Sequence, residues 1–125
     1  MSGIKAIINK FYTKKLKSNV ELKVLSTDIK RQHGYLLMHG FAINISDHDL
    51  SHVIAVCECF SANNELISKS DMLVDEMTIK PKGILAFSIA ADDNPDIFYL
   101  NLSFKYLFGP EIQATGMSRL YLQYA

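Results

Sequence analysis

The sequence predicts an all-β fold: an immunoglobulin-like antiparallel β-sandwich of about seven strands, preceded by a short amphipathic N-terminal helix. Two observations predict the sandwich. From residue 20 onward the chain is a series of short apolar runs, several of them alternating with polar residues. Turn residues separate these runs, as in 61–65, 81–83 and 109–110. The opening residues instead repeat apolar side chains at helical spacing, so we divide the chain into a basic helical segment, 1–18, and a sandwich domain, 19–125.

Residues 2–17 form the predicted helix, with Ser2 able to cap its start. A helix of about four turns is marginal alone in water, so its apolar face must be buried against something. We expect it to dock to a protein partner or an anionic membrane surface, with packing on the domain's own sheet as the alternative. The residues expected to make this contact are Ile4, Ile7, Ile8, Phe11, Lys10, Lys14 and Lys15.

The strands are expected over 20–29, 35–45, 52–60, 66–72, 84–90, 97–108 and 111–124, the last broken near Gly116. In the first of these the alternation slips at Leu25, which indicates a β-bulge. The second and third are expected to form a hairpin around the polar turn at 46–49. The third is apolar on both faces, which predicts a central strand that is covered on both sides.

The strand at 35–45 is expected to turn its bulkier alternate residues to the core. These are Leu37, Phe41, Ile43 and Ile45, which share one face with His39 because strand side chains alternate. Gly40 lies on the opposite face, and a glycine inside a strand marks a bulge or a close approach of another backbone.

The composition limits the class of protein to which the chain can belong. Hydrophobic residues make up 49% and charged residues 21%, which is typical of a globular domain and excludes general disorder. No apolar run approaches the ~20 residues of a membrane span, and lysines interrupt the opening residues where a signal peptide would be apolar. Cys57 and Cys59 lie two apart on one predicted strand, so we expect free buried thiols. Together these features favour a cytoplasmic protein, or one held peripherally at a membrane.

The net charge of zero hides an asymmetry. Residues 1–18 hold five of the thirteen basic residues and none of the thirteen acidic ones, which leaves a formal charge of −5 on the remainder. A basic segment beside an acidic body indicates an anionic partner for that segment, or docking onto the body itself. Nucleic acid is not expected as a partner, because single-strand binders need a positive groove.

Part of the chain resembles the FxLYD-type domains, small bacterial and archaeal immunoglobulin-like sandwiches. The resemblance covers roughly residues 40–90: Gly40-Phe41-Ala42-Ile43-Asn44-Ile45-Ser46, the strand at 53–60, the turn at 62–67, and Ile79-Lys80-Pro81-Lys82-Gly83 ahead of Phe87. Lys82-Gly83 replaces the family's usual Gly-Glu, and Phe60-Ser61 replaces its aromatic-Asp pair. The resemblance implies a sandwich fold and carries over no catalytic residue.

Asp47, His48, Asp49 and His52 form a compact group of ligand-capable side chains. A metal such as zinc needs three or four converging ligands, and a short turn supplies two, so a solvated polar turn is the simpler interpretation. The sequence shows no constellation of acid, base and nucleophile, so we expect neither an enzyme nor a cofactor. The prediction is a non-enzymatic interaction or structural module that self-associates through strand edges or an aromatic sheet face. The alternative is a small ligand- or metal-binding protein that uses the 47–52 turn.

Overall fold

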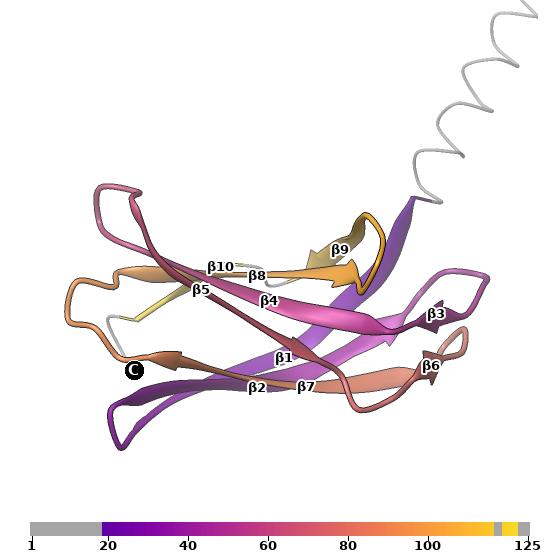
Figure 1. Cartoon of the computed structure of the whole chain (residues 1–125). Coiled ribbons are helices and arrows are strands. Elements are labelled where there is room, and N and C mark those ends of the chain that lie inside the picture. Colours follow the sequence, from indigo (N-terminus) through magenta and orange to yellow (C-terminus); the bar gives the residue numbers. More distant parts are fainter. Residues whose placement is uncertain (1–18, 117–118, 123–125) are drawn as a thin grey trace, which may run out of the picture.

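A computed structural model describes residues 19–116 and 119–122, and these residues are all-β, with no helix among them (Figure 1). The predicted helix over 1–18 lies outside the described residues. The strands are β1 (Val20–Gln32), β2 (Tyr35–Asn44), β3 (Leu50–Ser51), β4 (Val53–Phe60), β5 (Leu66–Leu73), β6 (Thr78–Ile79), β7 (Ile84–Asp92), β8 (Tyr99–Tyr106), β9 (Glu111–Gly116) and β10 (Arg119–Tyr121).

One sheet dominates the domain and folds over on itself. Its strand order is β5-β4-β8-β9-β1-β2-β7, β10 pairs with β8, and β3 and β6 form a separate two-stranded sheet. Figure 1 shows β4, β5 and β8 in one layer and β1, β2 and β7 in the other, so the sheet is nearly closed into a barrel-like shape. The core lies between these layers, where Phe87 of β7 meets Phe104 of β8 edge to face, with ring centroids 5.5 Å apart.

The prediction of a wholly antiparallel sheet is wrong, because β9 pairs antiparallel with β8 and parallel with β1. Hairpin-linked strands must run antiparallel, but β1 and β9 lie at opposite ends of the described chain. No short connection therefore fixes their relative direction. The resulting β9–β1 pairing joins the two layers into one mixed sheet.

The predicted hairpin at 35–60 is also wrong, although both of its strands exist. β2 pairs with β1 and β7, while β4 pairs with β5 and β8, so the connection between them crosses from one layer to the other. Buried Asn44 fixes this crossing: its side-chain amide donates to the carbonyls of His48 and Ile79, each at 2.9 Å. Its side-chain oxygen accepts from the backbone N–H of Ser46 at 2.9 Å. A buried polar side chain with these partners specifies the turn.

The core face of β2 is the opposite of the one predicted. Leu36, Met38 and Ala42 are buried, whereas Phe41 is 50% exposed. Both sets of alternate residues in this strand are apolar, so bulk alone does not identify the inner face. At Gly40 itself the inner face has no room for a side chain, because the ring of Phe87 and the backbone of Ser26 occupy that space.

Three local predictions are confirmed. The pairing of β1 with β2 shifts register between Val24 and Ser26, which is the bulge expected at Leu25. Gly40 marks a close approach, because a Cβ there would overlap the backbone carbonyl of Ser26 and lie 2.8 Å from Cζ of Phe87. β4 is mostly buried between β5 and β8, as expected of a central strand.

Candidate functional site

The residues predicted to make contacts from the N-terminal segment lie outside the described part of the chain. They are Ile4, Ile7, Ile8, Phe11, Lys10, Lys14 and Lys15, and their role stays a prediction. The structure does show where this segment joins the domain. The carbonyl of Glu21, near the start of β1, accepts a 2.9 Å hydrogen bond from the N–H of Ile45.

The 47–52 turn contributes to a polar network that the sequence did not reveal. Nε2 of His48 lies 2.7 Å from a carboxylate oxygen of Glu21, and Nδ1 lies 3.2 Å from Asp47. The hydroxyl of Tyr106 donates to the same Glu21 oxygen at 2.7 Å. Glu21 and Tyr106 are 85 positions apart, so no local pattern announces their contact. The network ties the start of β1, the turn and the end of β8 together.

The network also sets the protonation of its members. The hydrogen bonds from His48 to Glu21 and then to Asp47 raise the pKa of His48 above its ordinary value. Burial, followed by the hydrogen bond to Glu21, raises the pKa of Tyr106 well above its usual range. Tyr106 therefore stays a neutral donor, and the Glu21 carboxylate accepts from both neighbours. These hydrogen bonds connect β1 to β8 and to the 47–52 turn.

The four turn residues considered as metal ligands do not act together. Asp47 and His48 are in contact, but Asp49 is exposed, and His52 is held through its backbone, with its N–H donating to Met77 at 3.0 Å. Within residues 19–116 and 119–122, no group of three or more His, Cys, Asp or Glu side chains is placed to hold a metal ion.

The outer face of the β1-β2-β7 layer carries large apolar side chains. Phe41, Ile43 and Ile45 share the outward side of β2, Ile84 lies opposite Ile43 on β7, and Leu25 occupies the β1 bulge. All except half-buried Ile43 are between 46% and 55% exposed. We call these five residues the outer apolar patch.

The outer face of the other layer is chemically different. On it Glu58 of β4 lies opposite Lys69 of β5, and Lys105 of β8 lies opposite Glu111 of β9. Such cross-strand pairs of opposite charge are typical of a face in contact with water. The face that carries the outer apolar patch is charged in part as well, because Asp28 of β1 lies 3.5 Å from His39 of β2 and Lys23 lies opposite Ile43.

β7 lies at one end of the strand order and presents a strand edge. The N–H of Asn44 donates to Gly83, and that of Asp93 donates to Gly34, both at 2.9 Å and both in the β2–β7 register. Hydrogen-bonded pairs alternate along an antiparallel ladder, so residues 85, 87, 89 and 91 face β2. The backbone groups of residues 84, 86, 88 and 90 therefore point to the edge, away from β2.

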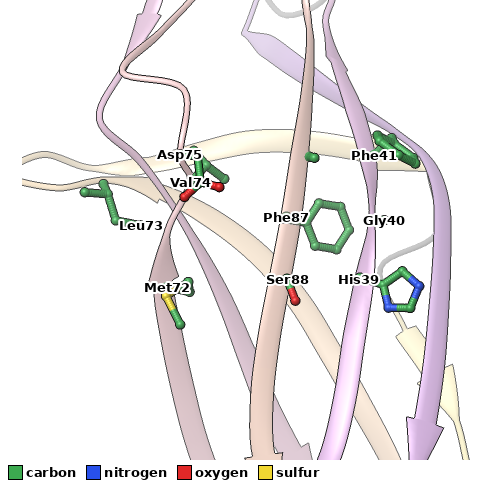
Figure 2. Close-up of a pocket in the computed structure, with 10 residues that line it drawn as sticks. His39, Gly40, Phe41, Met72, Leu73, Val74, Asp75, Phe87 and Ser88 are labelled. Atoms are coloured by element: carbon green, nitrogen blue, oxygen red, sulfur yellow. The ribbon is translucent and has the colours of Figure 1, made fainter.

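A groove of about 450 Å³ lies beside this edge, and we call it the β7 groove. It is lined by residues 39–41 of β2, 86–88 of β7 and 72–75 at the end of β5. Figure 2 shows Met72 and Leu73 on one side of β7 and His39 and Phe41 on the other. The lining is mainly apolar, and Phe41 belongs to both the groove and the outer apolar patch.

The aromatic residues of β8 do not form an open platform. Phe104 is fully buried, and Tyr99 stacks on Phe60 with ring centroids 5.0 Å apart. The guanidinium of Arg119 covers the Tyr99 ring at 4.6 Å, and Tyr121 packs against the same ring at 5.8 Å. These rings therefore pack against one another and against the guanidinium of Arg119.

Comparisons with known proteins support the fold and no function. No family model matches the sequence, and no curated protein does. Among solved structures, the Northeast Structural Genomics Consortium target SoR45 is similar, with a TM-score of 0.52 and 15% identity over 83% of this chain and 89% of that one. A GH20 exo-β-N-acetylglucosaminidase from Vibrio harveyi gives a TM-score of 0.37 and 13% identity over 82% of this chain and 19% of that one. At these identities the likeness to SoR45 shows a shared fold alone.

The described residues contain no helix long and apolar enough to cross a membrane.

Proposed function

We propose that this chain is a non-enzymatic interaction module that self-associates through the edge of β7. The observation that carries the proposal is the lack of edge protection along most of that strand. Natural edge strands carry charged side chains, proline or bulges that discourage pairing with another chain. The only charged residue of β7 is Asp92 at its C-terminal end, while residues 84–91 contain no charged residue and no proline, and their register with β2 is unbroken.

β5, the strand at the other end of the strand order, can be compared with β7. β5 carries Lys69 and Asp71, and its pairing with β4 shifts register between Cys59 and Phe60. β5 is therefore protected by the usual devices, and β7 is not. Two β7 edges related by a two-fold axis would extend the β1-β2-β7 layer into a six-stranded sheet, and two-fold dimers are the commonest oligomers.

The β7 groove supports the same proposal. Its apolar lining offers buried contact to side chains that flank an incoming strand, which adds to the backbone hydrogen bonds of the new pair. A non-enzymatic role fits the remaining polar groups, because the Tyr106–Glu21–His48 contacts link strands. We also propose that the fold follows the immunoglobulin-like plan, which the FxLYD-type resemblance implies. The two facing layers and the β9–β1 pairing support this plan.

The test is the mass of the full chain by light scattering at several concentrations. We expect a rise from the monomer mass of 14.1 kDa toward twice that value. Ser88→Pro should keep the protein monomeric, because it removes an N–H that points to the edge and leaves the bonds to β2 intact. Ser88→Ala, which keeps that N–H, is the matched control and should behave as the unmodified chain.

Two outcomes would count against the proposal. One is a mass of 14.1 kDa at every concentration. The other is association that is equal in Ser88→Pro and Ser88→Ala, since the contact would then lie away from β7. Circular dichroism of both variants establishes that each remains folded.

A further inference from the structure

We propose that a cleft between β8 and β9, on the outer face of the layer that contains β4, β5 and β8, binds a neutral saccharide. The cleft results from a split in the sheet. β10 pairs with residues 99–101 at the start of β8, and β9 pairs with Phe104 and Lys105 near its end (Figure 1). Beyond Ile112, β9 leaves β8 and pairs with β1 instead. A cleft of about 460 Å³ opens where the strands part, and we call it the β8–β9 cleft.

The rim of the β8–β9 cleft is rich in neutral groups that form hydrogen bonds. Asn101 and Ser103 line it from β8, and Gln113 and Thr115 line it from β9. Amide and hydroxyl side chains offer both donors and acceptors. A sugar hydroxyl also donates and accepts, so a saccharide can pair with each of these groups. The same ring of groups suits an apolar or purely acceptor ligand less well.

The acidic side chains on the rim have basic neighbours, which favours a neutral ligand. Glu58 lies opposite Lys69 of β5, and Glu111 lies opposite Lys105 of β8. A charged ligand would compete with these cross-strand neighbours for the same groups. A neutral ligand needs only hydrogen bonds, and its binding leaves no ligand charge without a partner.

Arg119 lines the cleft from β10 and is held in place without a ligand. Its Nε–H donates to the side-chain oxygen of Asn101 at 3.3 Å, and its guanidinium carbon lies 4.6 Å from the centroid of the Tyr99 ring. A planar guanidinium that is already held loses little conformational freedom when it binds. The bond to Asn101 uses Nε, so the terminal N–H groups can donate to hydroxyl oxygens of a ligand.

A half-exposed aromatic ring lies beside the cleft on the same face. Tyr121 follows Arg119 by two positions on β10, so both side chains lie on one side of the sheet, about 7 Å apart along the strand. Tyr121 is 49% exposed, and Phe98 packs against its ring edge to face at 5.6 Å. A pyranose ring carries C–H groups on its face and hydroxyls at its edge. A short saccharide would therefore place one ring on Tyr121 and the hydroxyls of the next ring in the cleft.

The test is binding of the full chain to an array of neutral oligosaccharides. The strongest binder is then titrated into the nitrogen-15-labelled chain and followed by NMR spectroscopy. We expect the amide signals of residues 101–103 and 113–115 to shift, while those of residues 84–91 in β7 stay unchanged. This measurement needs no variant, so it decides the location of the site even if a substitution disturbs the fold.

Two tyrosines of equal exposure provide matched variants. Tyr121→Ala removes the ring beside the cleft, and Tyr35→Ala removes a ring that is also 49% exposed, on β2 in the other layer. We expect Tyr121→Ala to weaken binding at least about fivefold, as truncation of an aromatic contact residue does, and Tyr35→Ala to leave it unchanged. Arg119→Lys keeps the charge and loses the planar fork, so it should also weaken binding. Circular dichroism establishes that each variant remains folded.

Three outcomes overturn the inference: no neutral oligosaccharide binds, the shifted amides lie away from the cleft, or Tyr121→Ala and Tyr35→Ala bind equally well. Adenosine is the competing probe, because it also joins hydroxyls to a flat ring. If adenosine shifts the cleft amides and no sugar does, the cleft takes a nucleoside instead. The inference does not rest on self-association, since the cleft and β7 belong to different layers. Ser88→Pro should bind the saccharide as the unmodified chain does, so failure of one proposal is distinguishable from failure of the other.

Discussion

Gly40 leaves no room for a Cβ beside the backbone of Ser26 on the neighbouring strand, and it gives the simplest prediction at the residue scale. Gly40→Ala should lower the free energy of unfolding by about 1–3 kcal/mol, because the added methyl overlaps the backbone carbonyl of Ser26 within the bulge. Urea denaturation measures the change. Ser88→Ala, at an exposed position of the adjacent strand, should stay within about 0.5 kcal/mol of the unmodified chain. Equal stability of the Gly40 variant would refute the close approach.

His48 predicts a dependence of stability on pH. Its carboxylate neighbours raise its pKa in the folded state, so the protonated form is favoured there. The stabilisation is fully present below the ordinary value of 6.5 and is lost as the pH rises through the raised folded value. The excess melting temperature of the unmodified chain over His48→Gln should therefore shrink between mildly acidic and alkaline pH. The effect is small because His48 is half exposed. A pH-independent difference would contradict it.

At the scale of strands, the local sequence pattern was sufficient to predict where strands form, but it did not predict which strands pair with each other. The expected ranges 35–45, 66–72 and 84–90 correspond closely to β2, β5 and β7, since alternation and turn residues are local signals. The prediction chose the wrong inner face of β2 because both of its faces are apolar. It also paired β2 with the wrong strand, because buried Asn44, through contacts as distant as Ile79, decides where the chain crosses to the other layer.

The burial of β4 predicts that its two cysteines do not react with thiol reagents in the native protein. Cys57 and Cys59 face the core and are at most 1% exposed. The hydrogen bond between the two thiols raises the pKa of Cys57 and lowers that of Cys59 to about 7, so the lack of access for a reagent is what keeps Cys59 unreactive. The native protein should leave both thiols unmodified by a disulfide reagent such as Ellman's, while unfolding in urea should release both. Ser88→Cys, exposed on β7, is the control that should react at once. Rapid modification of the native thiols would show that β4 is less covered than its burial indicates.

At the scale of the molecule, the features that position the candidate surfaces are the least visible in the sequence. β7 is an edge because, among the described strands, β2 alone is hydrogen-bonded to it, although the end of β5 lies across the β7 groove. The outer apolar patch gathers residues from β1, β2, β7 and the residue after β2, including three that the sequence assigned to the core, Phe41, Ile43 and Ile45. Each of these properties follows from long-range pairing, which strand-by-strand periodicity does not encode.

The single mixed sheet predicts that both layers unfold together. Ile112 of β9 is 1% exposed and lies opposite Phe104 of β8, in the strand that links the layers. Ile112→Ala should therefore cost about 2–5 kcal/mol and lower the stability of both layers equally. Two probes report separately: fluorescence of Phe41→Trp in β2, in a chain with no native tryptophan, and thiol exposure in β4.

Leu66→Ala, at a half-exposed position of β5, is the control for that measurement and should change both transitions little. Coincident urea transitions for the two probes, shifted together by Ile112→Ala, are the expected result. If the thiols of β4 became accessible while the β2 fluorophore kept its native transition, the layers would unfold separately. The β9–β1 pairing would then be too weak to unite them, because a mixed sheet that is continuous through β9 transmits the loss of one core contact to both sides.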